Sequence, residues 1–94
     1  MKEEYIKLLH IANEKLGKNF QVMLALEEMS ELSKELLKNI NRNENNDNKI
    51  IEEMGDMYIL LEQLKVVYNI SEQEILNIID KKMVRLNDRI SKMQ

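Results

Sequence analysis

Two short acidic segments carry the residues best suited to chemistry in this chain. Residues 27–31 read Glu-Glu-Met-Ser-Glu, and residues 52–56 read Glu-Glu-Met-Gly-Asp. Side chains three or four residues apart share one face of a helix, so each segment presents two carboxylates one turn apart. Carboxylates grouped in this way suit the binding of hard divalent cations.

The second acidic segment interrupts the apolar pattern of the helix expected around it. Glu53 falls in the middle of an apolar stripe, and Asp56 falls on its edge. A carboxylate turned towards a core costs several kcal/mol unless it is paired or binds a metal, so we expect both acids to have such a partner. The stripe recurs at the helical period between residues 47 and 69 and consists of Ile50, Met57, Leu60, Leu61, Leu64 and Val67.

Four helices are expected to position these segments. Hydrophobic periodicity predicts helices over residues 2–16, 19–41 and 47–69, separated by Gly17 and by an asparagine-rich loop over 41–48. We expect Asp47 or Asn48 to cap the third helix, and Ser71 with Glu74 to form a capping box that begins a fourth. The predicted core stripes are Val22, Leu26, Met29, Leu36 and Ile40 on the second helix, and Ile75, Ile79, Met83, Leu86 and Ile90 on the fourth.

The loop between the second and third helices is short, which favours antiparallel neighbours and brings the two acidic segments to the same level. Four converging carboxylates need cations. With oxygen ligands alone, Mg²⁺ is the natural choice and Mn²⁺ the common substitute, whereas a di-iron site of the ferritin type needs a Glu-x-x-His motif that the sequence lacks. A glycine inside a helix costs about 1 kcal/mol, so Gly55 suggests close approach of a helix or ligand beside Asp56.

The amino-acid composition limits the fold classes and functions that are possible for this chain. The chain has 94 residues, 44% of them hydrophobic and 33% charged, which describes a single all-α domain over residues 1–94 whose small core favours oligomerisation. Its net charge of −3, spread along the chain, disfavours binding to a nucleic acid polymer. The absence of Cys and the single histidine, His10, exclude thiolate sites and most imidazole metal sites. Without a signal-like or membrane-spanning segment, we expect a cytoplasmic protein that does not enter membranes.

The acidic residues of the second helix and the basic residues of the last helix can also be explained as solvent-exposed faces without a function. Glu28, Glu31 and Glu35 share one face of the second helix, which is also what a solvated face balanced by Lys34 and Lys38 would look like. Exposed basic rows on helices are common too. Such a row flanks the apolar stripe of the last helix and consists of Lys82, Arg85 and Arg89.

Taken together, the ordered motifs resemble those of the MazG-like nucleotide pyrophosphohydrolases, of the all-α NTP pyrophosphatase superfamily. The resemblance covers most of the chain: Glu-Glu-x-x-Glu at 27–31, Glu-x-x-Asp at 53–56, a preceding Gln21 and a basic last helix. It implies a four-helix protomer that assembles into a helical-bundle dimer or tetramer. It also implies Mg²⁺-dependent hydrolysis of a nucleoside triphosphate to a monophosphate and pyrophosphate.

Matched position by position, the resemblance assigns roles to individual residues. It implies that the metal ligands are Glu28, Glu31, Glu53 and Asp56. Catalytic roles fall to Glu27, Glu28 and Glu31, with Glu27 and Glu52 as candidates for the outer shell or for orienting water. Contacts to substrate would come from Gln21, Lys82, Arg85 and Arg89.

Three alternatives remain open. Phosphoribosyl-ATP pyrophosphohydrolase belongs to the same superfamily, but the Tyr-His that often follows the aspartate there is replaced by Met57 and Tyr58. A second alternative is a non-catalytic dimerisation or regulatory module on the same scaffold. The third is a helical-bundle interaction protein without a nucleotide site.

Overall fold

The computed structural model describes residues 1–93, and all of its regular elements are helices. The predicted all-α class with four helices is therefore confirmed. No helix within the described residues is both long and apolar enough to cross a lipid bilayer. The four helices are α1 (Glu3–Leu16), α2 (Lys18–Arg42), α3 (Asp47–Tyr68) and α4 (Glu72–Ser91).

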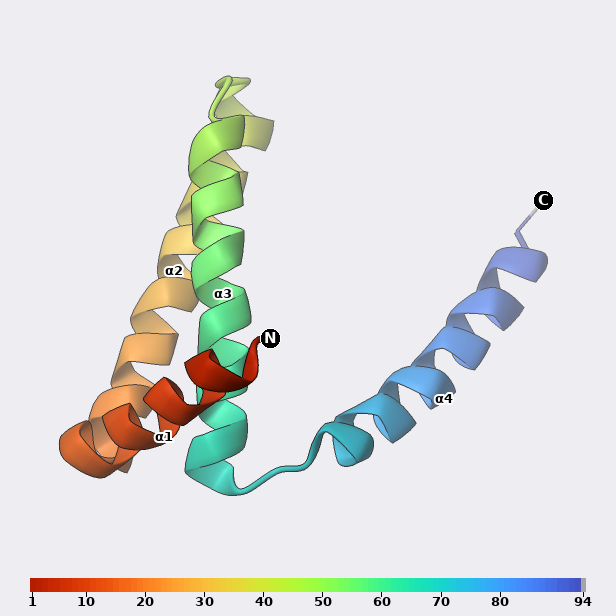
Figure 1. Cartoon of the computed structure of the whole chain (residues 1–94). Helices are drawn as coiled ribbons and strands as arrows, with labels where there is room; N and C mark the ends of the chain where they lie inside the picture. The colour runs from red at the N-terminus through yellow and green to blue at the C-terminus, as the bar shows by residue number, and fades with distance from the viewer. Residues whose placement is uncertain (94) are drawn as a thin grey trace.

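Helices α2 and α3 form an antiparallel pair, and α1 lies across the end of that pair where α2 begins (Figure 1). The reversal between α1 and α2 takes place at Gly17, whose φ of 84° suits a residue without a Cβ atom. Gln63 of α3 is buried and donates a hydrogen bond to the carbonyl of Leu9 in α1, at 3.1 Å. This hydrogen bond links α1 to α3 and helps to hold α1 against the pair formed by α2 and α3.

A polar network closes the loop between α2 and α3. Asn46 donates from Nδ2 to both the carbonyl and the carboxylate of Glu35, at 2.8 and 3.0 Å, and accepts from Asn39. The hydrogen bond from Asn46 holds the pKa of the buried Glu35 below its usual value, although burial opposes it, and Lys38 lowers it further. Asn46 is also the N-cap of α3, so the prediction that Asp47 or Asn48 caps this helix is wrong by one or two residues.

The predicted packing face of α2 is wrong for the single chain. The residues of α2 that are buried are Gln21, Ala25 and Glu35, on the side that contacts α3. Leu26 and Ile40, which were expected in the core, are 53% and 77% exposed. Apolar residues lie on more than one side of α2, so periodicity alone does not identify the side that packs. The face that carries Glu28 and Glu35 is turned towards α3 and is not the solvated face of the simpler interpretation.

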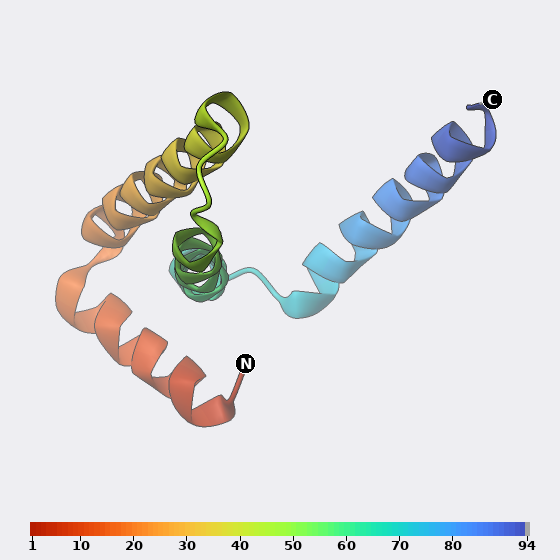
Figure 2. The same ribbon diagram turned by 90° about the horizontal axis from the view of Figure 1, so that it is seen from above.

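Helix α4 projects away from the other three helices (Figures 1 and 2). The capping box at Ser71 and Glu74 is present as predicted. However, none of the residues of α4 is buried, and Met83 and Ile90 of its apolar stripe are each 55% exposed. The prediction that this stripe packs into a core within the chain is wrong, as it is for Leu61 of α3, which is 52% exposed.

Candidate metal centre

Three of the predicted carboxylates converge between α2 and α3. Glu28 comes from α2, and Glu53 and Asp56 lie one turn apart on α3. One carboxylate oxygen from each lies within 4.8 Å of the other two, and all three residues are half-buried. The antiparallel pairing of α2 and α3 brings Glu28 together with Glu53 and Asp56, as expected of two long helices joined by a short loop.

The three carboxylates form an electrostatically strained group. Burial raises the pKa of the Glu28 carboxyl above its usual value, and the negative charges of Asp56 and Glu53 raise it further. Hydrogen bonds between the protonated Glu28 carboxyl and the side chains of Asp56 and Glu53 raise this pKa further. Among the described residues, Glu53 Oε2 is buried without a hydrogen-bond partner. A buried, unpaired carboxylate oxygen among like charges is an arrangement that a cation would relieve.

The donor set fits a divalent cation that prefers oxygen. Opposite ligands of Mg²⁺ lie about 4.2 Å apart, and this ion usually keeps several waters. Oxygens within 4.8 Å of one another therefore need small side-chain rotations to share one ion. A depression of about 150 Å³ beside the carboxylates, lined by Leu24, Glu28, Asp56, Ile59 and Leu60, leaves room for water or a ligand.

The other acids of the two segments are placed differently. Glu31, Glu27 and Glu52 are exposed, and Glu31 is not part of the convergent group. Glu27, Glu28 and Glu31 do line one surface depression on α2, so Glu31 lies beside the group rather than within it. The sequence predicted four ligands at this level, and the structure brings three together.

The predicted contacts to substrate are scattered. Gln21 is buried on α2, with 3% of its surface exposed. The basic row of Lys82, Arg85 and Arg89 lies on α4, which extends away from α2 and α3 (Figure 2). Within one chain, no element brings these cations to the acidic group.

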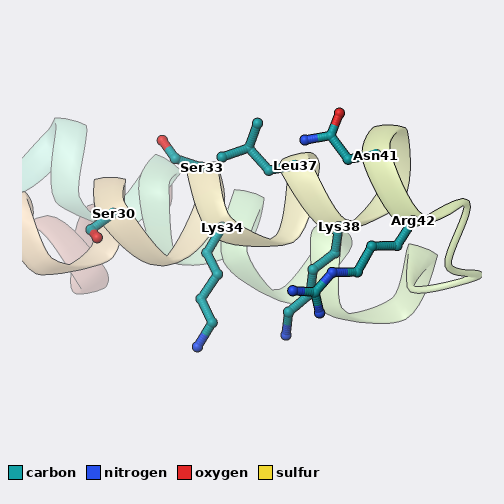
Figure 3. A pocket seen from close by; sticks show the side chains of 7 residues that line it. All are labelled: Ser30, Ser33, Lys34, Leu37, Lys38, Asn41 and Arg42. Carbon is teal, nitrogen blue, oxygen red and sulfur yellow. The ribbon is translucent and has the colours of Figure 1, made fainter.

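A different basic row lies on α2 itself. Figure 3 shows Lys34, Lys38 and Arg42 extending to one side of the helix, whereas Leu37 lies on the other side. Lys38 is paired with Glu35 at 3.4 Å, so part of its charge is already compensated. This row lies on the C-terminal half of α2, beyond the acidic segment, and is not a component of the carboxylate group.

An apolar groove that the sequence patterns did not predict lies between α1 and α3. The groove has a volume of about 640 Å³, and its lining includes Tyr5, Leu8, Leu9, Gly55, Tyr58 and Ile59. A Cβ atom added at Gly55 would have no neighbour within 4 Å, so the expected close approach to this glycine does not occur within the chain. The unusual helical glycine was the one signal for the groove in the sequence.

Comparisons with protein-family models, with curated proteins and with solved structures give no match to this chain.

Proposed function

We propose that the protein is a Mg²⁺-dependent nucleoside triphosphate pyrophosphohydrolase of the MazG-like type. The observation that carries the proposal is the convergence of Glu28, Glu53 and Asp56, with a buried and unpaired oxygen on Glu53. In the order and spacing of these acids the chain resembles that family. The same resemblance, together with the exposed apolar faces of α2 and α4, favours a homodimer or homotetramer.

In this proposal Glu28, Glu53 and Asp56 hold the cation between α2 and α3. When bound, Mg²⁺ neutralises phosphate oxygens and lowers the pKa of coordinated water. Glu27 and Glu31 line a surface depression with Glu28, and in this proposal they would orient water and accept its proton. Lys82, Arg85 and Arg89 would offset charge on the pyrophosphate leaving group if they were brought to the site.

A panel of ribo- and deoxyribonucleoside triphosphates, assayed for pyrophosphate with Mg²⁺ and with EDTA, tests the proposal. We expect pyrophosphate and a monophosphate from at least one substrate with Mg²⁺ alone, and loss of this activity in Glu53→Gln. Release of inorganic phosphate without pyrophosphate would contradict the assigned reaction, and full activity in Glu53→Gln would contradict the assigned site.

The position of α4 favours one alternative, a non-catalytic regulatory module on the same scaffold. Because α4 projects away from α2 and α3, a single chain does not bring its basic row of Lys82, Arg85 and Arg89 to the acidic group. Calorimetric titration with a non-hydrolysable triphosphate and Mg²⁺ separates the two functions. Binding without any pyrophosphate release from the matching substrate would favour the module.

A further inference from the structure

One side of α2 changes from negative to positive along the helix. Side chains three or four residues apart share one side of a helix. Such spacings lead from the convergent carboxylate of Glu28 to Glu31, and then to a basic row. The row consists of Lys34, Lys38 and Arg42, which extend to the same side of α2 (Figure 3). A ligand with cationic and anionic parts would find partners for both along this side.

Two surface depressions on α2 connect the acids to the basic row. The first has a volume of about 460 Å³, and its lining includes Glu28 and Glu31. The second has a volume of about 440 Å³, and its lining includes Lys34 and Lys38. Each volume lies within the range of about 300–1,000 Å³ that is usual for small-molecule sites. Ser30 lines both depressions, so a ligand bound at the carboxylates can extend along α2 to the cations.

The basic row is only partly neutralised by acids of the same chain. Within residues 1–93, Lys34 and Arg42 form no ion pair, and Lys38 is paired with Glu35 at 3.4 Å. The carboxylate of Glu35 also accepts a hydrogen bond from Asn46, at 3.0 Å. One ion pair among three cations leaves this end of α2 positively charged, so it attracts anions.

The reach of two lysines suits a short phosphate chain that begins at the carboxylates. Lys34 and Lys38 lie six and ten residues beyond Glu28, which is about 9 and 15 Å along the axis of α2. Helical side chains lean towards the N-terminus, and each lysine ammonium stands on a flexible four-carbon stem. Leaning back by one turn moves each ammonium group about 5 Å towards Glu28. Phosphates that lie beyond the first one, which the cation would hold, therefore come within reach of Lys34 and Lys38.

We infer that Lys34 and Lys38 bind the far end of a triphosphate whose near end is held by a divalent cation at Glu28, Glu53 and Asp56. The cation joins phosphate oxygens to carboxylates that would otherwise repel them, and the lysines offset the charge of the remaining phosphates. Both lysines belong to the same chain as the carboxylates, so this contact needs neither a second chain nor a movement of α4. That the phosphate chain belongs to a nucleotide rests on the proposed function.

Calorimetric titration of the full chain with inorganic tripolyphosphate in Mg²⁺ tests the inference without reference to activity. Lys34→Gln removes one charge-assisted hydrogen bond and should raise the dissociation constant about tenfold. Lys34 is exposed, so this variant should keep the helical circular dichroism and the Mg²⁺-dependent melting temperature of the wild type. Lys34→Arg keeps the charge and should bind within about threefold of the wild type. Lys7→Gln is the matched control, because it removes the same charge from an exposed position on α1.

The outcomes separate this inference from the proposed function. Absence of tripolyphosphate binding by the wild type would overturn the inference, and so would equal affinities of the wild type and Lys34→Gln. An equal loss of affinity in Lys7→Gln would also overturn it, because the effect would then follow net charge and not position. Binding that depends on Lys34, without pyrophosphate release from any nucleoside triphosphate, would contradict the proposed function alone. Pyrophosphate release with an unchanged KM in Lys34→Gln would overturn the inference alone.

Discussion

The effect of Glu53→Gln on stability distinguishes a cation site from a cluster of surface acids that binds no ion. Without a divalent cation, an oxygen of Glu53 lies within 4.8 Å of oxygens of Glu28 and Asp56. Two unit charges at that distance repel by about 1 kcal/mol in water and by about 3.5 kcal/mol at an effective dielectric constant of about 20. Since all three residues are only half-buried, the lower figure applies. Removing two such repulsions should stabilise the metal-free protein by about 1–2 kcal/mol, which raises its melting temperature by roughly 5–10 °C.

The same substitution should abolish the response to Mg²⁺. A cation present at about 100 times its dissociation constant stabilises the wild type by about 2.7 kcal/mol, because it binds only the folded state. Thermal melts followed by circular dichroism, in EDTA and in Mg²⁺, measure both effects. Glu52→Gln is the matched control, since Glu52 is exposed and outside the convergent group, and it should melt like the wild type in both buffers. The reasoning is refuted if Glu53→Gln lowers the melting temperature in EDTA, or if the wild type does not respond to Mg²⁺.

Three further predictions concern pH and the helix caps. Because the pKa of Glu28 is raised in the folded state, the metal-free protein binds more protons than the unfolded chain just above pH 4.5, and urea titrations should show its stability falling as the pH rises through that window. The pKa of Glu35 is lowered instead, so the stability that this carboxylate contributes is present above pH 4.5 and lost as the pH falls below it. Asn46→Ala removes the hydrogen bond to Glu35, so it should abolish this loss of stability in acid and lower the urea midpoint of unfolding at neutral pH. Ser71→Ala removes the capping box of α4 and should cost about 1 kcal/mol, seen as a lower helical signal from this exposed helix.

The helices were predictable because their signals are local. The periodicity of each segment, Gly17 at the first reversal and the capping box at Ser71 all appear within a few residues of the boundary they set. The convergence of Glu28 with Glu53 and Asp56 was predictable for a related reason. A short loop makes two long helices antiparallel neighbours, so that segments on the two helices can meet. The exact level was not predictable, because residues 27–31 lie 11–15 residues before the end of α2 whereas residues 52–56 lie 5–9 residues after the start of α3.

Periodicity predicted most of the packing face of α3, where Leu60 is buried and Ile50, Met57, Leu64 and Val67 are half-buried, but it did not predict the packing faces of α2 and α4. Gln21 and Glu35 are buried on α2 while Leu26 is exposed, which reverses the usual preference of polar and apolar side chains. Glu35 can be buried because Asn46, from the loop eleven residues later, satisfies its carboxylate, and periodicity contains no information about that partner. Most residues of the apolar faces that periodicity assigned to the core of α2 and α4 are exposed in the single chain.

The most direct test of the central claim is hydrolysis of a triphosphate in heavy-oxygen water, with Mg²⁺, by the wild type and by Asp56→Asn. If Glu28, Glu53 and Asp56 hold the cation for attack at the α phosphorus, the wild type releases pyrophosphate and the label appears in the monophosphate. Asp56→Asn should then retain its helical fold and release no pyrophosphate. Equal pyrophosphate release by both proteins, or none by the wild type with any triphosphate, would contradict the account.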